Sequence, residues 1–280
     1  MRKIFFTVIK AFLFFVGWVL AVSLISVPEF ENPAVWRFAA ELIPFLCIVG
    51  MSILFWMIEK RKVQIISFSD LPKNCLVGII GGGIWLGSAA FIMLFIGVLK
   101  ISDADSIPML WLWIFSVFIN TIMQELLVRG YLYQVIKREY NVIAAAVIST
   151  ALFTFMHGGA FEAGIIPVLN VVTMSFLMTA VLEYTHSLLA PVIMHFLWNS
   201  AGAVILGGVS LAEDYPHLLN AVFSGNILLS GGICKMEGSI IVLLVNMVLI
   251  GFFIVPVFQM KGDFSYEAEH SYQKSGRSRS

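Results

Sequence analysis

Long runs of hydrophobic residues alternate with short polar stretches along most of the chain. A membrane-spanning helix needs about 20 mostly apolar residues. By this measure the sequence predicts eight such helices, at residues 4–27, 36–57, 76–99, 108–128, 142–158, 164–184, 187–206 and 237–259. The first run follows Met1-Arg2-Lys3, and it is too long for the apolar region of a signal peptide, so it is expected to be a retained helix. The fold class expected is therefore all-α, a polytopic membrane helix bundle.

The composition agrees with a membrane protein. Of 280 residues, 60% are hydrophobic and 12% are charged, whereas soluble domains carry roughly 25% charged residues. The net charge is zero, which gives no electrostatic basis for binding nucleic acid, so no nucleic-acid partner is expected. The three cysteines, Cys47, Cys75 and Cys234, form no CxxC pair and indicate neither a disulfide framework nor a zinc knuckle.

The charged residues in the short loops predict the orientation of the helices. Lys and Arg are enriched in cytoplasmic loops. Basic residues stand at the start of the chain and after the second and fourth runs, where they include Lys60, Arg61, Lys62, Lys137 and Arg138. The alternate loops are acidic, with Lys100 as the main exception, and they contain Glu29, Glu31, Asp103, Asp105, Glu162, Glu213 and Asp214. Both termini are therefore expected in the cytoplasm. Residues 261–280 are polar and rich in serine, and we expect them to form a disordered cytoplasmic tail.

The fourth run has a less certain end. After Pro108 no proline interrupts residues 108–140, and Gly130 is the only helix-weakening residue there. One helix could run from 108 to 139, with its second part along the inner interface. In that case Glu125 and Arg129 lie within the bilayer rather than at its edge.

Three short polar motifs interrupt the apolar runs: Gln124-Glu125-Leu126-Leu127-Val128-Arg129-Gly130, Phe153-Thr154-Phe155-Met156-His157 and His195-Phe196-Leu197-Trp198-Asn199. Ionisable side chains are costly within a membrane, so they usually pair with each other or serve a function. The motifs together predict a polar pocket inside the helix bundle.

Each motif has both a structural and a chemical interpretation. Glu125 and Arg129 are four residues apart and can pair on one helix face, either as a structural ion pair or as a carboxylate that activates water beside an orienting arginine. His195 and Asn199 share a face in the same way, and they could hydrogen-bond to another helix or to a developing oxyanion. His157, taken alone, is more typical of a histidine at the membrane interface.

Other polar groups in the apolar runs have mainly structural interpretations. Asn120 and Gln124 form a stripe of the kind that holds membrane helices together. A structural role is also favoured for the intramembrane residues Glu41, Asn170 and Glu183, and Gly81-Gly82-Gly83 predicts a close contact between helices. Two histidines and a glutamate could hold zinc, but the HExxH motif of the helical zinc proteases is absent.

The three motifs, in this order and spacing, resemble the CPBP family, which comprises the type II CAAX prenyl endopeptidases and the bacterial bacteriocin-processing and self-immunity (Abi) proteins. The family pattern is Glu-Glu-x-x-x-Arg, then Phe-x-x-x-His, then His-x-x-x-Asn or Asp. The resemblance predicts a family core at 105–260, preceded by N-terminal transmembrane helices at 1–100. The implied location is a bacterial plasma membrane.

The resemblance implies an intramembrane endopeptidase that hydrolyses a membrane-proximal peptide bond with an activated water. Glu125 or His157 would take the proton from water, Arg129 would hold Glu125, and His195 and Asn199 would stabilise the oxyanion. The substrate would be a membrane-associated or lipidated peptide or protein. Family members have been called metalloproteases, and a metal-free glutamate mechanism is also inferred for them. Since no third clear ligand appears here, we favour a site without a metal cofactor over a zinc site.

One position departs from the family pattern. The first glutamate of the first motif is Gln124 here, and a glutamine side chain has no carboxylate to act as a general base. This departure favours a second interpretation, a catalytically silent member that acts in bacteriocin self-immunity or binds a peptide. A transporter is less favoured, because the polar motifs do not recur in two repeated halves.

Overall fold

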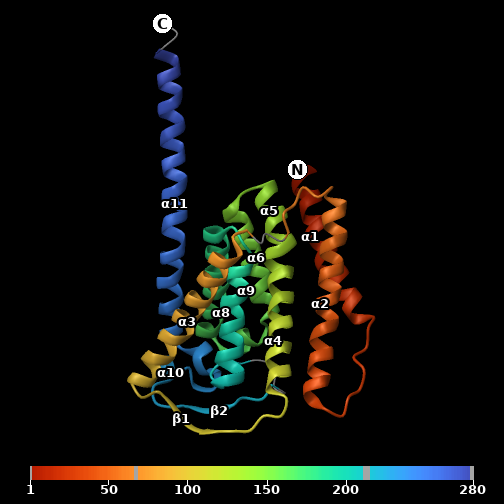
Figure 1. Ribbon diagram of the computed structural model, residues 1–280, viewed down its shortest axis with the longest axis vertical. Coiled ribbons are helices and arrows are strands. Elements are labelled where there is room, and N and C mark those ends of the chain that lie inside the picture. Colours follow the sequence, from red (N-terminus) through yellow and green to blue (C-terminus); the bar gives the residue numbers. More distant parts are fainter. Residues whose placement is uncertain (1, 66–68, 211–214, 278–280) are drawn as a thin grey trace.

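The computed structural model describes residues 2–65, 69–210 and 215–277 as a bundle of long helices that run roughly along one common direction (Figure 1). The helices are α1 (Arg2–Ser23), α2 (Pro33–Ile58), α3 (Leu71–Phe95), α4 (Leu110–Glu125), the π-helix η1 (Leu126–Leu132), α5 (Tyr133–Glu139), α6 (Val142–Met156), α7 (Gly159–Ala163), α8 (Ile165–Thr185), α9 (Leu189–Asn199), the π-helix η2 (Ser200–Ile205), α10 (Ile227–Ser230), the 3₁₀-helix η3 (Gly232–Gly238) and α11 (Ile240–Arg277). Two short strands, β1 (Leu99–Ala104) and β2 (Leu219–Phe223), complete the fold.

The helices have the lengths expected of membrane spans. Among the described residues, six helical segments are long and apolar enough to cross a membrane: Ile4–Ser23, Pro33–Ile58, Leu71–Phe95, Leu110–Glu139, Ile165–Thr185 and Gly232–Gln259. The two remaining predicted spans correspond to shorter apolar helices, Val142–Met156 and Leu189–Ile205. The prediction of an all-α polytopic membrane bundle is confirmed, and the chain is an integral membrane protein.

Local sequence explains where α2 begins and where the chain turns between α8 and α9. The side chain of Asn32 accepts hydrogen bonds from the backbone N–H groups of Ala34 and Val35, at 2.9 and 3.3 Å, and Pro33 occupies the first turn of α2. Such caps satisfy backbone donors that the helix itself cannot pair. The short gap between the predicted runs 164–184 and 187–206 contains His186, which adopts a left-handed conformation between α8 and α9.

The fourth run forms one continuous helical segment of 30 residues, from Leu110 to Glu139. It passes through η1 before continuing as α5, so Gly130 does not end it. Glu125 and Arg129 are both fully buried in this segment. The longer of the two helices that the sequence allowed is therefore the one formed, and both charged residues lie well inside the bundle.

The structure differs from the sequence-based expectation at two places. α11 continues to Arg277, through most of the segment 261–280 for which we expected a disordered tail; no proline follows Pro256, and the segment contains good helix formers. β1 and β2 pair in antiparallel fashion between loops at the end away from the termini, although the sequence predicted no strands. Glu213 and Asp214 lie outside the described residues.

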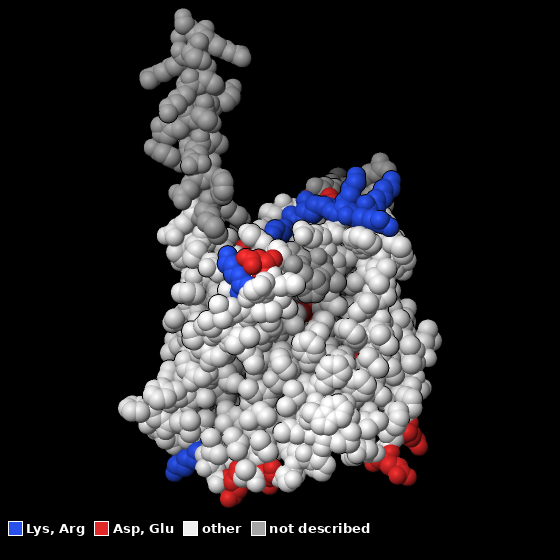
Figure 2. All heavy atoms as spheres, viewed as in Figure 1, with Lys and Arg blue, Asp and Glu red and all other residues white. Residues whose placement is uncertain are grey.

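Charged residues gather at the two ends of the bundle and leave its flank largely uncharged. Figure 2 shows most of the visible Lys and Arg toward the end where the N-terminus lies and most of the visible acidic residues at the opposite end, where Lys100 of β1 is also exposed. Near the basic end the carboxylate of Glu59 binds Lys10 of α1 at 2.6 Å and Arg138 of α5 at 2.7 Å. Burial alone would raise the pKa of Glu59, but hydrogen bonds from these two cations hold that pKa below its ordinary value. The N-terminal helices are thus tied to the core by an ionised group.

A seam of small residues brings α3 close to α9, as the glycine run predicted. A Cβ atom added at Gly82 would lie 2.9 Å from Leu197 Cδ1 and 3.1 Å from the backbone Cα of Met194. Gly81 faces the side chain of Met194 in the same way, whereas a Cβ at Gly83 would meet nothing within 4 Å. Close to this seam the rings of Trp85 and Trp198 stack with centroids 4.2 Å apart.

We predict that Gly82→Ala lowers the melting temperature of the detergent-purified protein, because the new methyl group overlaps the backbone of α9. Overpacking of this kind commonly costs about 1–3 kcal/mol. Gly83→Ala is the matched control: it makes the same change one residue away, in open space, and is expected to leave stability unchanged or slightly raised. Equal effects of the two variants on thermal unfolding would contradict the proposed close contact.

Candidate active site

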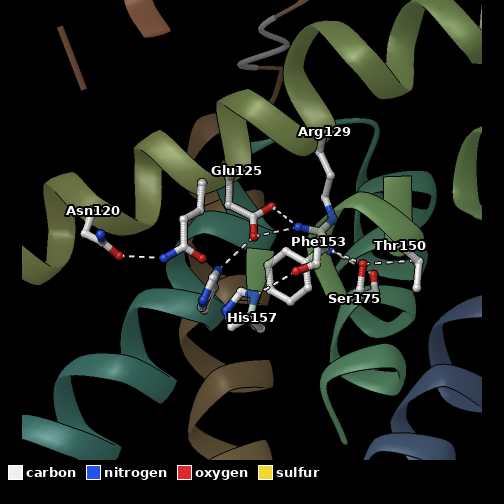
Figure 3. Close-up of polar contacts among 9 residues, drawn as sticks. Asn120, Glu125, Arg129, Thr150, Phe153, His157 and Ser175 are labelled. Atoms are coloured by element: carbon white, nitrogen blue, oxygen red, sulfur yellow. Dashed lines mark hydrogen bonds and ion pairs between the residues drawn. The ribbon is translucent and has the colours of Figure 1, made fainter. Parts of the chain in front are cut away.

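The centre of the site is the carboxylate of Glu125, which is completely buried at the end of α4. Arg129, one turn later in η1, donates from Nη1 to both carboxylate oxygens, at 2.8 and 2.9 Å. The same arginine donates from Nη2 to the backbone oxygen and to Oγ of Ser175 in α8, at 3.0 and 2.8 Å (Figure 3). A charge this deep requires such partners, since an unpaired buried ion costs several kcal/mol.

His195 of α9 completes the buried cluster. Its Nδ1 lies 2.8 Å from Oε1 of Glu125. An ionised carboxylate can only accept hydrogen bonds, so Nδ1 carries the proton and Nε2 remains available. Glu125 thereby sets the tautomer and orientation of His195. We refer to Glu125, Arg129 and His195 as the buried triad.

Phe153 of α6 lies between the buried triad and His157. Its ring centroid is 4.3 Å from that of His157 and 6.0 Å from that of His195, and the guanidinium carbon of Arg129 lies 5.1 Å from it. The backbone oxygen of Phe153 also accepts a hydrogen bond from Nδ1 of His157 at 2.8 Å. A carbonyl cannot donate, so Nδ1 of His157 is protonated and the neutral ring leaves Nε2 as an acceptor.

A cavity of about 280 Å³ adjoins these residues, and it is lined by Glu41, Val117, Asn120, Met123, Gln124, Met156, His157, Ser210 and Tyr215. Gln124 and His157 therefore face the cavity from two different motifs. Neither Glu125 nor His195 lines it. Because consecutive residues of a helix point about 100° apart, Gln124 turns toward the cavity while Glu125 turns toward Arg129.

A chain of hydrogen bonds fixes the amide of Gln124. Nδ2 of Asn120 donates to Oε2 of Glu41 at 2.7 Å, and Nε2 of Gln124 donates to Oδ1 of Asn120 at 2.7 Å. The carboxylate can only accept, so Asn120 must turn its nitrogen to Glu41 and its oxygen to Gln124. Oε1 of Gln124 is consequently left buried, with no hydrogen-bond partner among the described residues.

Glu41 lies on α2 and is held in place from three directions. Arg37, one turn earlier, and the hydroxyl of Tyr215 each contact Oε1 at 3.2 Å, and Asn120 contacts the other oxygen. From the sequence we expected a mainly structural role for Glu41 and did not predict that it lines a cavity, and no feature of the sequence was a reason to select Tyr215. Only the spacing of Arg37 and Glu41 gave a sign of a buried pair; nothing local in the sequence shows that α2 packs on this part of α4.

Five of the six predicted site residues thus fall into two groups. Glu125, Arg129 and His195 form the buried triad, whereas Gln124 and His157 line the cavity. Asn199 lies one turn after His195 and is buried, but its side chain makes no hydrogen bond within the described part of the chain. Of Glu125, His157, His195 and Asn199, which we expected to serve one polar pocket, His157 lines this cavity, and the rings of His157 and His195 both lie beside Phe153.

The geometry does not fit a metal ion. Both oxygens of Glu125 contact the guanidinium of Arg129, which would repel a cation at that position. Across the described ranges, no three His, Cys, Asp or Glu side chains gather closely enough to hold a metal. Since a zinc site needs three or four such ligands, we derive no step through a metal.

The fold and the site define a polytopic helical membrane protein that keeps a glutamate, an arginine and two histidines inside its bundle. Residues 106–201, which carry all three motifs, match the family model described as type II CAAX prenyl endopeptidase Rce1-like. The chain therefore carries a domain of this family, and the resemblance to the CPBP family is confirmed. No curated protein matches the chain in sequence.

We predict that Arg129→Met strongly destabilises the protein, because it leaves the carboxylate of Glu125 buried without its main partner. Removing one member of a buried ion pair typically costs about 3–5 kcal/mol. The double variant Glu125→Leu with Arg129→Met should recover part of this loss, and Lys73→Met, which removes an exposed charge, is the control. Thermal unfolding in detergent measures all three. A wild-type melting temperature for Arg129→Met would show that the buried triad does not support the fold.

Proposed function

We propose that the chain is an intramembrane endopeptidase that cleaves a membrane-proximal peptide bond with a water molecule activated in the cavity. The observation that carries this proposal is a pair of hydrogen-bond acceptors without partners, one on each of two residues that line the cavity. Nε2 of His157 is left without a proton by the bond from Nδ1 to Phe153, and Oε1 of Gln124 has no partner among the described residues. One water molecule has two hydrogens, which these two acceptors would share.

In this arrangement His157 is the general base and Gln124 positions the water. His157 would take one proton at Nε2 as the water oxygen attacks the peptide carbonyl carbon, and the Nδ1 bond to Phe153 would hold the ring during the transfer. Gln124 would accept the second hydrogen without taking the proton. Glu41 acts through Asn120, because it decides which end of the Gln124 amide is presented to the cavity.

The buried triad would then act on the developing negative charge. In this proposal His195 acts in its protonated form, in which Nε2 carries an N–H that would donate to the oxyanion, and donors of this kind are most effective away from bulk water. Glu125 is expected to support this histidine rather than to activate water, since its own oxygens are engaged by Arg129 and His195. We keep Asn199 as a second candidate donor because it lies on the same face of α9.

The substrate we propose is a short extended segment of a membrane-associated or lipidated peptide or protein. The cavity volume is near the lower end of the roughly 300–1,000 Å³ typical of ligand sites, which suits one or two side chains rather than a folded domain. Bacteriocin leader peptides and lipidated C-terminal tails both belong to this class. Selective entry would depend on the cavity wall, which includes residues of α2 and of the segment after η2.

We predict that His157→Ala lowers turnover of a membrane-anchored peptide by about 10²–10⁴-fold, the usual loss when an acid–base group is removed. Gln124→Glu should keep or raise the rate, because a carboxylate can both orient water and accept its proton. Gln124→Met, of similar size but without a strong acceptor, should lower the rate. Cleavage by purified protein in liposomes, followed by mass spectrometry over a range of pH, measures these effects.

A peptide-binding or immunity protein is the second candidate, and the lack of a carboxylate at position 124 favours it. The same experiment separates the two functions when peptide binding is measured beside cleavage. A protease requires that His157→Ala keeps binding but loses cleavage. If the wild-type protein and Gln124→Glu bind peptide equally and neither cleaves it, the binding function stands and the protease proposal fails.

We also propose that both termini and the basic end face the cytoplasm of a bacterial plasma membrane, as the distribution of Lys and Arg favours. In a variant without the native cysteines, Asp103→Cys in β1 should react with a membrane-impermeant maleimide on intact cells. Lys73→Cys in α3, at the other end of the bundle, should react only after the membrane is opened. Both positions are exposed on the protein surface. The reverse labelling pattern would invert the proposed orientation.

A further inference from the structure

A second pocket lies at the basic end of the bundle. It has a volume of about 580 Å³, and it shares no lining residue with the cavity of the proposed active site. Its walls are mostly apolar and come from α2, from the segment after α2 and from the first residue of η1, including Val49, Ile53, Val63 and Leu126. This volume is well within the range of small-molecule sites.

Two basic residues stand at the edge of this pocket. Arg61 and Lys62 both line it, and neither forms an ion pair with any residue in the described part of the chain. No acidic residue is among the lining residues. The guanidinium of Arg61 lies 4.9 Å from the ring of Trp56, another wall residue, so it is held over the pocket. The pocket therefore combines an apolar interior with a positively charged rim.

The backbone that presents these charges is in an unusual conformation. Lys60 and Arg61 both adopt positive φ angles, 53° and 62°, and the N–H of Arg61 bonds to the backbone oxygen of Trp56 at 2.9 Å. Left-handed conformations cost roughly 1–2 kcal/mol per residue outside glycine. Two in succession turn the chain back over the last turn of α2. Left-handed residues are common just after the end of a helix, where their N–H groups bond to its last carbonyl groups.

A buried polar group inside the pocket points to a ligand as well. Ser52 lines the pocket with only 3% of its surface exposed, and its hydroxyl has no hydrogen-bond partner among the described residues. A buried hydroxyl without a partner is unfavourable. A ligand that reaches past the rim with an ester or another acceptor group would satisfy it.

We propose that this pocket binds one anionic phospholipid from the membrane leaflet at the basic end. One acyl chain would lie among the apolar walls, the ester region would reach Ser52, and the phosphate would bind Arg61 and Lys62. Arginine suits phosphate through its planar set of donors. The apolar interior of the pocket favours a lipid over free phosphate. The pocket lies at the end of α2, and the end of a membrane-spanning helix is where lipid headgroups are expected. The inference does not depend on peptide hydrolysis.

The test uses the purified full-length protein in detergent with added phosphatidylglycerol or phosphatidylcholine. Native mass spectrometry counts retained lipid, and thermal unfolding measures its effect. We expect phosphatidylglycerol to be retained and to raise the melting temperature more than phosphatidylcholine does. The double variant Arg61→Gln with Lys62→Gln should weaken this association on the order of tenfold. Lys73→Gln, which removes an exposed charge at the same end of the bundle, is the matched control and should change nothing.

Filling the pocket tests the apolar part of the site. Ser52→Phe should abolish retention of phosphatidylglycerol, and Ile53→Trp is the second filling variant in case the first does not fold, because Ile53 is already half exposed. Inorganic phosphate alone should not raise the melting temperature. The proposal is overturned if Lys73→Gln weakens binding as much as the double variant, if the two lipids are retained equally, or if a folded filling variant still holds the lipid.

Discussion

The need to neutralise one carboxylate deep in the bundle organises the helices around it. Glu125 is stable at that depth only because Arg129 and His195 contact it. Arg129 in turn bonds to Ser175, which lies 3.0 Å from Oγ1 of Thr150, so the same charge draws η1, α8, α9 and α6 toward one point. Apolar packing alone would let these helices slide or rotate, whereas the geometry of the ion pair allows one arrangement.

This constraint also explains why two adjacent residues have different surroundings. Both carboxylate oxygens of Glu125 accept hydrogen bonds from its partners, so this residue stabilises the fold and orients His195. Gln124, the next residue, faces the cavity and belongs to a separate hydrogen-bond chain through Asn120 to Glu41. An amide suits that place because it donates to Asn120 and still keeps one acceptor for the cavity. The departure from the family pattern therefore alters the role of the position: the amide nitrogen is bonded to Asn120, and the amide oxygen has no partner among the described residues.

Periodic information in the sequence predicted most of the fold, and information on contacts between distant segments was missing. Long apolar runs predicted the six helical segments that are long enough to span a membrane and the two shorter apolar helices. The spacing of Glu125 and Arg129 predicted their pair, and the glycine run predicted a close contact between helices, which α3 makes with α9. Glu41 and Tyr215 could not be placed, because their position depends on how α2 and the segment after η2 pack against α4. The π-helical segments and the strand pair also followed from tertiary packing rather than from local propensity.

The cavity wall has a mixed origin. Asn120, Gln124 and His157 belong to the segment that matches the family, 106–201, whereas Glu41, Ser210 and Tyr215 lie outside it. Related chains can therefore inherit the same motifs with different walls, since the helices that supply the other side are free to diverge. Replacing α1 and α2 by unrelated helices would leave the buried triad intact but would remove Glu41, so the cavity wall and the orientation of the Gln124 amide both depend on helices outside the matched segment.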